Sequence, residues 1–341
     1  MEDGMSWSKD KNLVLLAVTG CLALQIAQSP AYGETTAKAE VPTANSKTNQ
    51  TEIETSKAPD AWESLTKSAE AKASAGDYRN AEKLFNQANV LAKTFASDDP
   101  RRIKSVENLA EAIELQGRYT DALERYQDAF NLRKTVHGES SDRLSKSYFN
   151  IGRVQRLAGD FAKARTNLKK ALDLRQFSSS EEANQKDIAL IRILYNLGIL
   201  ETATGEFSAA EEHLNRAQSI AQHLAKHKEN AQIFGQLALL SIAEGDLPKA
   251  ENQAETSLSM AEKFAKGDKL VRAEALDSVA MAQLARGNFR KASDASSEAL
   301  SLKPVGNGGD INALTEQFIN CAIYVSMNFT NNISIRVNSF L

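Results

Sequence analysis

The sequence has little cysteine, proline, glycine or aromatic character. Its 341 residues include 2 cysteines, 6 prolines and 17 glycines, and 6% of them are aromatic. Two cysteines exclude a disulfide framework and a multi-thiolate metal site. Few helix breakers, together with plentiful Ala, Leu, Glu and Lys, predict a strongly helical chain. Neither sign of charge dominates, since 41 basic residues stand against 44 acidic ones, and this balance argues against a nucleic-acid-binding protein.

The N-terminal segment has the features of a secretory signal. Residues 13–24 are apolar, Lys9 and Lys11 precede them, and small residues follow. This order predicts a signal peptide over residues 1–33, because the apolar run is shorter than the about 20 residues that span a bilayer. We therefore expect an exported protein, periplasmic or extracellular. Cys21 ends the tetrapeptide VTGC, which resembles a bacterial lipobox. A lipoprotein or an uncleaved signal is thus the alternative, and only these forms would be bound to a membrane.

Residues 34–60 have the composition of a flexible linker. From Glu34 to Pro59 there is neither an aromatic residue nor a glycine, and polar residues dominate. Such a tract cannot bury enough apolar surface to offset the entropy lost on ordering. Asp60 and Glu63 form a plausible capping box, which predicts that the first helix begins at Asp60.

Six copies of one pattern follow, over residues 61–304. The anchor of each copy is a glycine, and the separations between successive anchors are 40 to 46 residues. The anchors are Gly76, Gly117, Gly159, Gly205, Gly245 and Gly287. An aromatic residue or leucine comes two residues later, and small residues lie seven before and twelve after each anchor. Alanine comes five residues after every anchor, at Ala81, Ala122, Ala164, Ala210, Ala250 and Ala292.

Each position of the pattern has a structural reason. A glycine can adopt the left-handed conformation that ends one helix and starts a tight turn. The aromatic residue then begins the second helix. Small residues allow two antiparallel helices to cross closely, so Gly152 and Ala164 are expected to face each other inside one hairpin. The pattern therefore predicts six antiparallel helix hairpins.

This pattern resembles the tetratricopeptide repeat. The segments YFNIG at residues 148–152 and LYNLG at residues 194–198 are similar to the first-helix signature of that family. The period near 42, rather than about 34, is similar to the longer kinesin-light-chain type. The resemblance implies an all-α, right-handed superhelical solenoid of antiparallel hairpins, with six repeats plus a partial seventh. Residues 305–341 start that seventh unit and then leave the pattern, so we interpret the chain as truncated or frame-shifted relative to a longer parent.

No motif for catalysis or cofactor binding is found. Nothing in the sequence resembles a phosphate loop, a nucleophile elbow or a zinc-protease helix. His223 and His227 have the spacing of metal ligands on one helical face, but flanking lysines favour a solvated basic helix end. Cys321 is interpreted as a buried small apolar residue. We therefore predict a protein that is not an enzyme and that has no cofactor and no metal.

The resemblance implies that the first helix of each repeat lines a concave face. In the first two repeats this face is acidic, with Glu63, Glu70, Lys104, Glu107, Glu111 and Glu114. In the last two it is apolar, with Leu239, Ile242, Met281 and Leu284. The centre is basic and aromatic and carries two asparagines: Lys146, Phe149, Asn150, Arg153, Arg156, Arg192, Tyr195 and Asn196. Asparagine amides can pair with a peptide backbone, and arginines with carboxylates.

We therefore predict a non-catalytic scaffold that binds a peptide or protein segment on its concave face. The identity of that partner is not encoded in these residues. The family's clamp for chaperone tails is not expected, because the lysines that accompany its asparagines are mostly absent. Two alternatives remain open: a truncated regulatory part of a larger protein that has lost its effector domain, and a structural spacer in the cell envelope.

Overall fold

The computed structural model describes residues 51–139, 141–176, 183–265 and 267–302. The predicted signal, Cys21, most of the predicted linker, the partial seventh repeat and Cys321 lie outside these residues. The described part contains twelve α-helices and one short 3₁₀ helix, and no strand. None of the described helices combines the length and apolar character needed to cross a membrane.

The helices form six consecutive antiparallel hairpins. In chain order the pairs are α2 (Thr51–Ser74) with α3 (Tyr78–Ala92), α4 (Pro100–Glu114) with α5 (Tyr119–His137), α6 (Ser145–Leu157) with α7 (Phe161–Gln176), α8 (Ala183–Thr204) with α9 (Phe207–His223), α10 (His227–Glu244) with α11 (Leu247–Phe264), and α12 (Lys269–Ala285) with α13 (Phe289–Leu302). The 3₁₀ helix η1 (Asp142–Leu144) leads into α6. The predicted all-α solenoid of six hairpins is confirmed.

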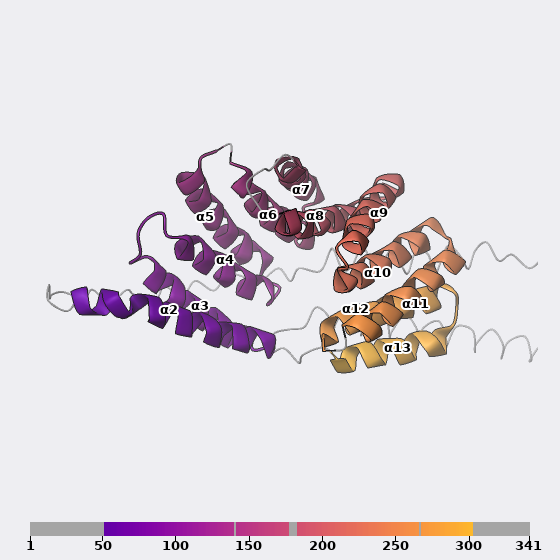
Figure 1. Cartoon of the computed structure of the whole chain (residues 1–341). Coiled ribbons are helices and arrows are strands. Elements are labelled where there is room, and N and C mark those ends of the chain that lie inside the picture. Colours follow the sequence, from indigo (N-terminus) through magenta and orange to yellow (C-terminus); the bar gives the residue numbers. More distant parts are fainter. Residues whose placement is uncertain (1–50, 140, 177–182, 266, 303–341) are drawn as a thin grey trace, which may run out of the picture.

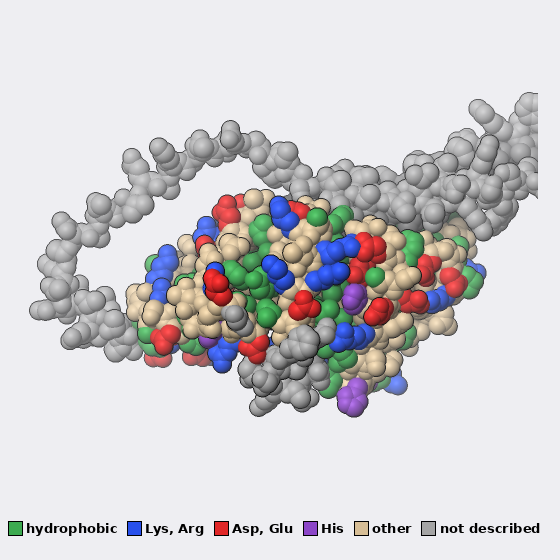
Figure 2. Space-filling view, turned by 90° about the horizontal axis from the view of Figure 1, so that it is seen from above, with side chains coloured by type: hydrophobic (Ala, Val, Ile, Leu, Met, Phe, Trp, Pro, Cys, Tyr) green, Lys and Arg blue, Asp and Glu red, His purple; other side chains and the backbone are tan. Residues whose placement is uncertain are grey.

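The hairpins stack side by side into an arch (Figure 1). Helices α4, α6, α8 and α10 lie toward the inside of the arch, whereas α5, α7 and α9 lie on its outer side. Seen from the side of α5, α7 and α9, the surface mixes basic, acidic and hydrophobic side chains and has no large area of one charge (Figure 2). This mixture agrees with the net charge of −3.

The pattern of glycine and small residues occupies the positions that the sequence predicts. All six anchor glycines have a positive φ, between 74° and 84°. The residue two positions after each anchor is the first residue of the second helix in every hairpin. The six alanines five positions after the anchors are fully buried. Left-handed turns and close helix crossings therefore repeat along the whole array.

The contact at Gly152 shows why the crossing positions require small residues. A methyl group placed on Gly152 would lie 3.1 Å from the carbonyl oxygen of Ala164 and 2.9 Å from Cγ of Leu168. At Gly198, the equivalent position one repeat later, such a methyl would lie 2.5 Å from Cγ of Leu214. The backbones of the paired helices approach so closely that a side chain would not fit without movement.

Apolar side chains from successive hairpins merge into a continuous core. Its largest cluster joins α7, α8, α9 and α10 and includes Leu168, Leu194, Leu197 and Leu214, all fully buried. Because each hairpin buries its apolar surface against the next one, the array holds its curvature as a unit. That curvature places the inner helices next to one another.

The start of the first helix differs from the prediction. Helix α2 begins at Thr51, so residues 51–60 of the predicted linker are helical, and Pro59 lies inside the helix. The predicted capping box is wrong, because Glu63 pairs with Lys67 one turn further along instead of reaching back to Asp60. Pro59 lacks the N–H that an interior helix position uses, but the eight residues before it contain no glycine or proline, and the helix extends through them.

The two histidines with metal-ligand spacing do not share a helical face. His223 is the last residue of α9, and His227 is the first residue of α10. Between them the chain turns through Ala225, whose φ is +50°. The His227 ring stacks on Phe264 with a centroid separation of 3.9 Å. The expected common face is therefore wrong, and the spacing arises from a turn between repeats.

Candidate functional site

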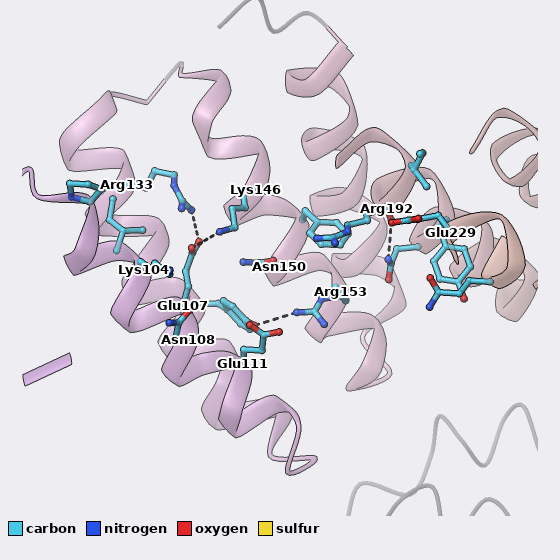
Figure 3. Close-up of a pocket in the computed structure, with 18 of the residues that line it drawn as sticks. Lys104, Glu107, Asn108, Glu111, Arg133, Lys146, Asn150, Arg153, Arg192 and Glu229 are labelled. Atoms are coloured by element: carbon cyan, nitrogen blue, oxygen red, sulfur yellow. Dashed lines mark hydrogen bonds and ion pairs between the residues drawn. The ribbon is translucent and has the colours of Figure 1, made fainter. Parts of the chain in front are cut away.

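A cavity of about 710 Å³ opens on the inner side of the arch. Its walls come from helices α4, α5, α6, α8 and α10, so residues from four successive repeats face one space (Figure 3). Seven of the eight predicted site residues line it: Lys146, Phe149, Asn150, Arg153, Arg192, Tyr195 and Asn196. Arg156 is not among the lining residues and is half-buried.

Glu107 of α4 is bound by two cations from later helices. Its side chain is buried and lies 2.8 Å from Arg133 Nη1 on α5 and 2.8 Å from Lys146 Nζ on α6 (Figure 3). Burial opposes ionisation of this carboxyl group, but Arg133 and Lys146 outweigh burial and lower the pKa of Glu107. Glu107 is thus an ionised link between the second and third repeats, not part of a free acidic rim.

Glu114 forms a second link between these two repeats, two turns further along α4. Arg153 of α6 donates to both of its carboxylate oxygens, at 2.5 and 2.8 Å, and the Tyr126 hydroxyl donates at 3.0 Å. Burial raises the pKa of Glu114, and the neighbouring Arg153 and Tyr126 reduce that rise without abolishing it. The predicted basic centre and the predicted acidic rim therefore neutralise each other at Arg153.

Arg156 and Asn196 form a further contact between repeats. The Asn196 carbonyl oxygen accepts from Arg156 Nε and Nη2, both at 3.3 Å. The Asn196 amide nitrogen donates to the backbone oxygen of Arg192 at 2.9 Å. Burial lowers the pKa of Arg156. Asn196 already uses both ends of its side chain, so it orients Arg156 inside the protein.

Several polar side chains of the cavity have no partner among the residues that the structure describes. Within the described residues, no hydrogen bond or ion pair engages the side chains of Glu111, Asn150, Arg192 or Glu229. These four come from α4, α6, α8 and α10, one from each inner helix. Lys104 is exposed and lies only over the ring of Trp62, at 5.9 Å. These groups give the cavity both signs of charge and an amide that a ligand could bind.

Aromatic side chains form the apolar part of the cavity wall. Phe149 and Tyr195 are half-buried and pack against the largest core cluster, which fixes their position. Burial and the charge of Glu274 raise the pKa of Tyr195, so its hydroxyl stays protonated and can donate a hydrogen bond. A ligand could therefore contact an aromatic surface between Asn150 and Arg192.

The predicted apolar end of the groove is largely absent from the surface. Ile242 is 1% exposed and packs with Ala250, Ala254 and Ala282, while Leu284 is also buried. Leu239 and Met281 are half-buried against the same cluster. Neighbouring helices cover these positions, because the later repeats use them to join hairpins. The prediction of an open apolar floor there is wrong.

Sequence reasoning missed some residues that line the cavity. Arg133 and His137 come from the second helix of their repeat, and Lys228, Glu229 and Gln232 from the start of α10. One signal was available, because Glu107 and Lys146 are 39 residues apart, as are Glu114 and Arg153. Opposite charges separated by nearly one repeat on inner helices indicate a bridge between adjacent hairpins. In the described residues, no group of three or more potential metal ligands is assembled.

Comparisons with known proteins agree with this architecture. Residues 99–176 match the tetratricopeptide-repeat family. The clustered mitochondria protein homolog of Candida albicans is 28% identical over 119 residues, which cover 34% of this chain and 9% of that much longer protein.

Solved structures give a similar result. NprR, in complex with its cognate peptide NprX, is 13% identical with a TM-score of 0.55, and the match covers 79% of this chain and 72% of NprR. The TPR-like repeats of a kinesin light chain from Podosopora anserina are 18% identical with a TM-score of 0.47, covering 61% of this chain and 98% of that one. Residues 99–176 cover two of the six hairpins, and the whole described array is consistent with a tetratricopeptide-repeat protein.

Proposed function

We propose that this protein is a scaffold that captures a segment of a partner protein in its inner cavity. Tetratricopeptide repeats generally act as non-catalytic interaction modules. The observation that carries the proposal is the set of uncommitted polar groups in the cavity, one from each of four inner helices. A rigid array that holds such groups in place reduces the entropy lost on binding.

The chemistry of the cavity suggests a peptide with polar groups of both signs. The Asn150 amide can pair with a peptide N–H and C=O, and Arg192 can bind a carboxylate. Glu111 and Glu229 can accept from a basic side chain or an N-terminus. Phe149 and Tyr195 offer aromatic contact between these groups. The related fold of NprR holds a peptide, which makes a peptide a reasonable class of ligand here.

Arg153 and Arg156 join neighbouring repeats, so they are not assigned to ligand binding in this proposal. Arg153 is committed to Glu114, and Arg156 to Asn196. A ligand carboxylate would have to displace an existing partner to reach Arg153. Arg192 is exposed and unpaired among the described residues, so it is the arginine of this set best placed to bind an acidic group.

The test is affinity capture with the full chain and two matched variants. Cells that express each form are treated with a chemical cross-linker, and captured proteins are identified by mass spectrometry. Arg192→Glu reverses the free cation in the cavity, whereas Lys169→Glu makes the same charge change on the outer helix α7. We expect a partner that is retained by Lys169→Glu and lost with Arg192→Glu. A partner profile identical for all three forms would contradict the cavity as the binding site.

We also propose that the protein acts outside the cytoplasm. The support is the basic, apolar and small-residue order within residues 1–33. N-terminal sequencing of the chain recovered from the exported fraction tests this proposal. A mature N-terminus at Tyr32 or Glu34 is expected, a lipid-modified Cys21 would indicate an anchored form, and an intact N-terminus in the cytoplasmic fraction would contradict export.

A further inference from the structure

A second groove runs along the outside of the first two repeats. Two cavities, of about 720 and 450 Å³, share Asn89, Lys93 and Arg125 and therefore form one continuous depression. Helices α3 and α5 are its walls, and α4 is its floor. The α4 residues that form this floor, such as Val106 and Ile113, lie on the helix face opposite the one that faces the inner cavity. We call this depression the α3–α5 groove.

The groove has an apolar floor and polar walls. Val106, Leu109 and Ile113 are buried at its base, and Val90 on the α3 wall is 59% exposed. Its lining along α3 extends from residue 79 to residue 93, which corresponds to about 21 Å at 1.5 Å per residue. A helix of about 14 residues has this length.

Among the described residues, the α3–α5 groove has unpaired basic side chains but no unpaired acidic side chains. Each of its acidic side chains, Glu82, Asp121, Glu124 and Asp128, is already in an ion pair with Arg118 or Arg125. By contrast, four basic side chains that line it have no ion pair within the described residues. These are Arg79, Lys83, Lys93 and Arg102. The charges of the groove that are free to pair with a ligand are therefore all positive.

The two ends of the groove differ. At one end Arg118, the residue before α5, reaches across to Glu82 of α3 at 2.9 Å, and Gln116 donates to the same carboxylate at 2.7 Å. This bridge closes the depression on that side. Toward the other end, Lys93 and Arg102 stand without ion-pair partners in the described part of the chain. A ligand would thus run from the bridge toward a cationic opening.

We propose that the α3–α5 groove docks an acidic amphipathic helix from another protein. Its apolar face would cover Val90 and the floor of α4, and its acidic side chains would pair with the free cations of α3 and α4. The terminal segments of this chain are poor candidates for the occupant, since residues 1–50 and 303–341 have nearly balanced charge. This docking site is separate from the inner cavity and does not depend on the function proposed for it.

The experiment uses the full chain and fluorescent peptides of about 14 residues. One set carries leucines on one helical face and glutamates elsewhere, and a second set replaces each glutamate with lysine. Binding is measured by fluorescence anisotropy for the wild type, for Lys83→Glu/Lys93→Glu in the groove, and for Lys169→Glu/Lys291→Glu elsewhere. The two double variants change the net charge equally, and all four lysines are exposed, so helix content and melting should match the wild type.

We expect the acidic set to bind the wild type and the control variant, with affinity at least about tenfold weaker for the groove variant. The lysine set should not bind. Absence of binding by every acidic amphipathic peptide at millimolar concentration would overturn the proposal, and so would equal binding by the two double variants. Equal binding of an acidic peptide with serines in place of leucines, or of a single-stranded oligonucleotide, would also overturn it, because the groove would then be a general anion patch.

Discussion

Replacing Arg153 with alanine tests whether the inner face is held together by ion pairs between repeats. Arg153 extends from α6 to the buried carboxylate of Glu114 on α4 and donates to both of its oxygens. The Arg153→Ala variant leaves this carboxylate with one hydrogen bond, from Tyr126. The variant therefore creates a buried charge that lacks its cation.

The size of the effect follows from burial. Removing one partner of a fully buried ion pair costs about 3–5 kcal/mol of unfolding free energy. The Arg153 side chain is 27% exposed, so solvent screens part of its interaction. We expect the loss at neutral pH to be about 2–3 kcal/mol.

The effect should depend on pH with a defined sign. The pKa of Glu114 is already raised by burial, and Arg153 is the largest influence acting against that rise. Without Arg153 the folded-state pKa rises further above the unfolded value of about 4.3. A carboxyl group with a raised folded-state pKa adds most to the free energy of unfolding at low pH. This contribution is lost as pH rises through the folded-state pKa. The difference between wild type and variant should therefore be smallest near pH 4 and grow toward pH 7.

Urea denaturation followed by circular dichroism at both pH values measures this difference. Arg192→Ala is the matched control, because it removes an exposed arginine without a partner in the described residues and should change stability by less than about 0.5 kcal/mol. The double variant Arg153→Ala/Glu114→Gln should recover part of the loss, since no charge is left buried. Equal stability of Arg153→Ala and Arg192→Ala at pH 7 would refute the reasoning.

Three further predictions concern stability. Gly152→Ala gains about 1 kcal/mol of helix propensity but forces a methyl against Ala164 and Leu168, so the net loss should be about 1–2 kcal/mol in thermal melts; a melting temperature above wild type would contradict the close crossing. Gly205→Ala meets no atom within 4 Å but holds a φ of +80°, so it should cost about 1 kcal/mol from backbone strain alone, and an unchanged melt would argue against that turn. Because the pKa of Glu107 is lowered, its contribution to stability is present above the unfolded-state pKa and is lost as pH falls through the folded-state pKa. Glu107→Gln should therefore flatten the acid side of the stability–pH curve. An unchanged acid side would show that the ion pairs of Glu107 contribute little.

The fold was predictable because its rules are local and repeat. A left-handed turn needs glycine, and a close helix crossing needs a small residue, wherever they occur. Ala164 illustrates this, since it is fully buried and faces Gly152 as predicted. The start of α2 was not predictable in this way, because Asp60 offers a cap and Pro59 disfavours a helical residue before it, yet the helix extends back to Thr51.

The shared cavity of the inner-face residues was predictable, but their internal pairing was not. Asn150, Arg153 and Arg192 line one cavity, as their common assignment to the concave face implies. Arg153 is neutralised by Glu114 from the preceding repeat, a pairing that no single repeat reveals. Which charges remain free depends on how neighbouring hairpins stack, and that information is not contained in any one repeat.

Photo-cross-linking from inside the cavity is the sharpest test of peptide capture at this site. A photoreactive amino acid replaces Asn150 in one form of the full chain and Lys169 of the outer helix α7 in another. We expect that a partner segment is captured from position 150, and that the added change Arg192→Glu abolishes this capture. Equal capture from positions 150 and 169, or capture from position 150 that is indifferent to Arg192→Glu, would contradict it.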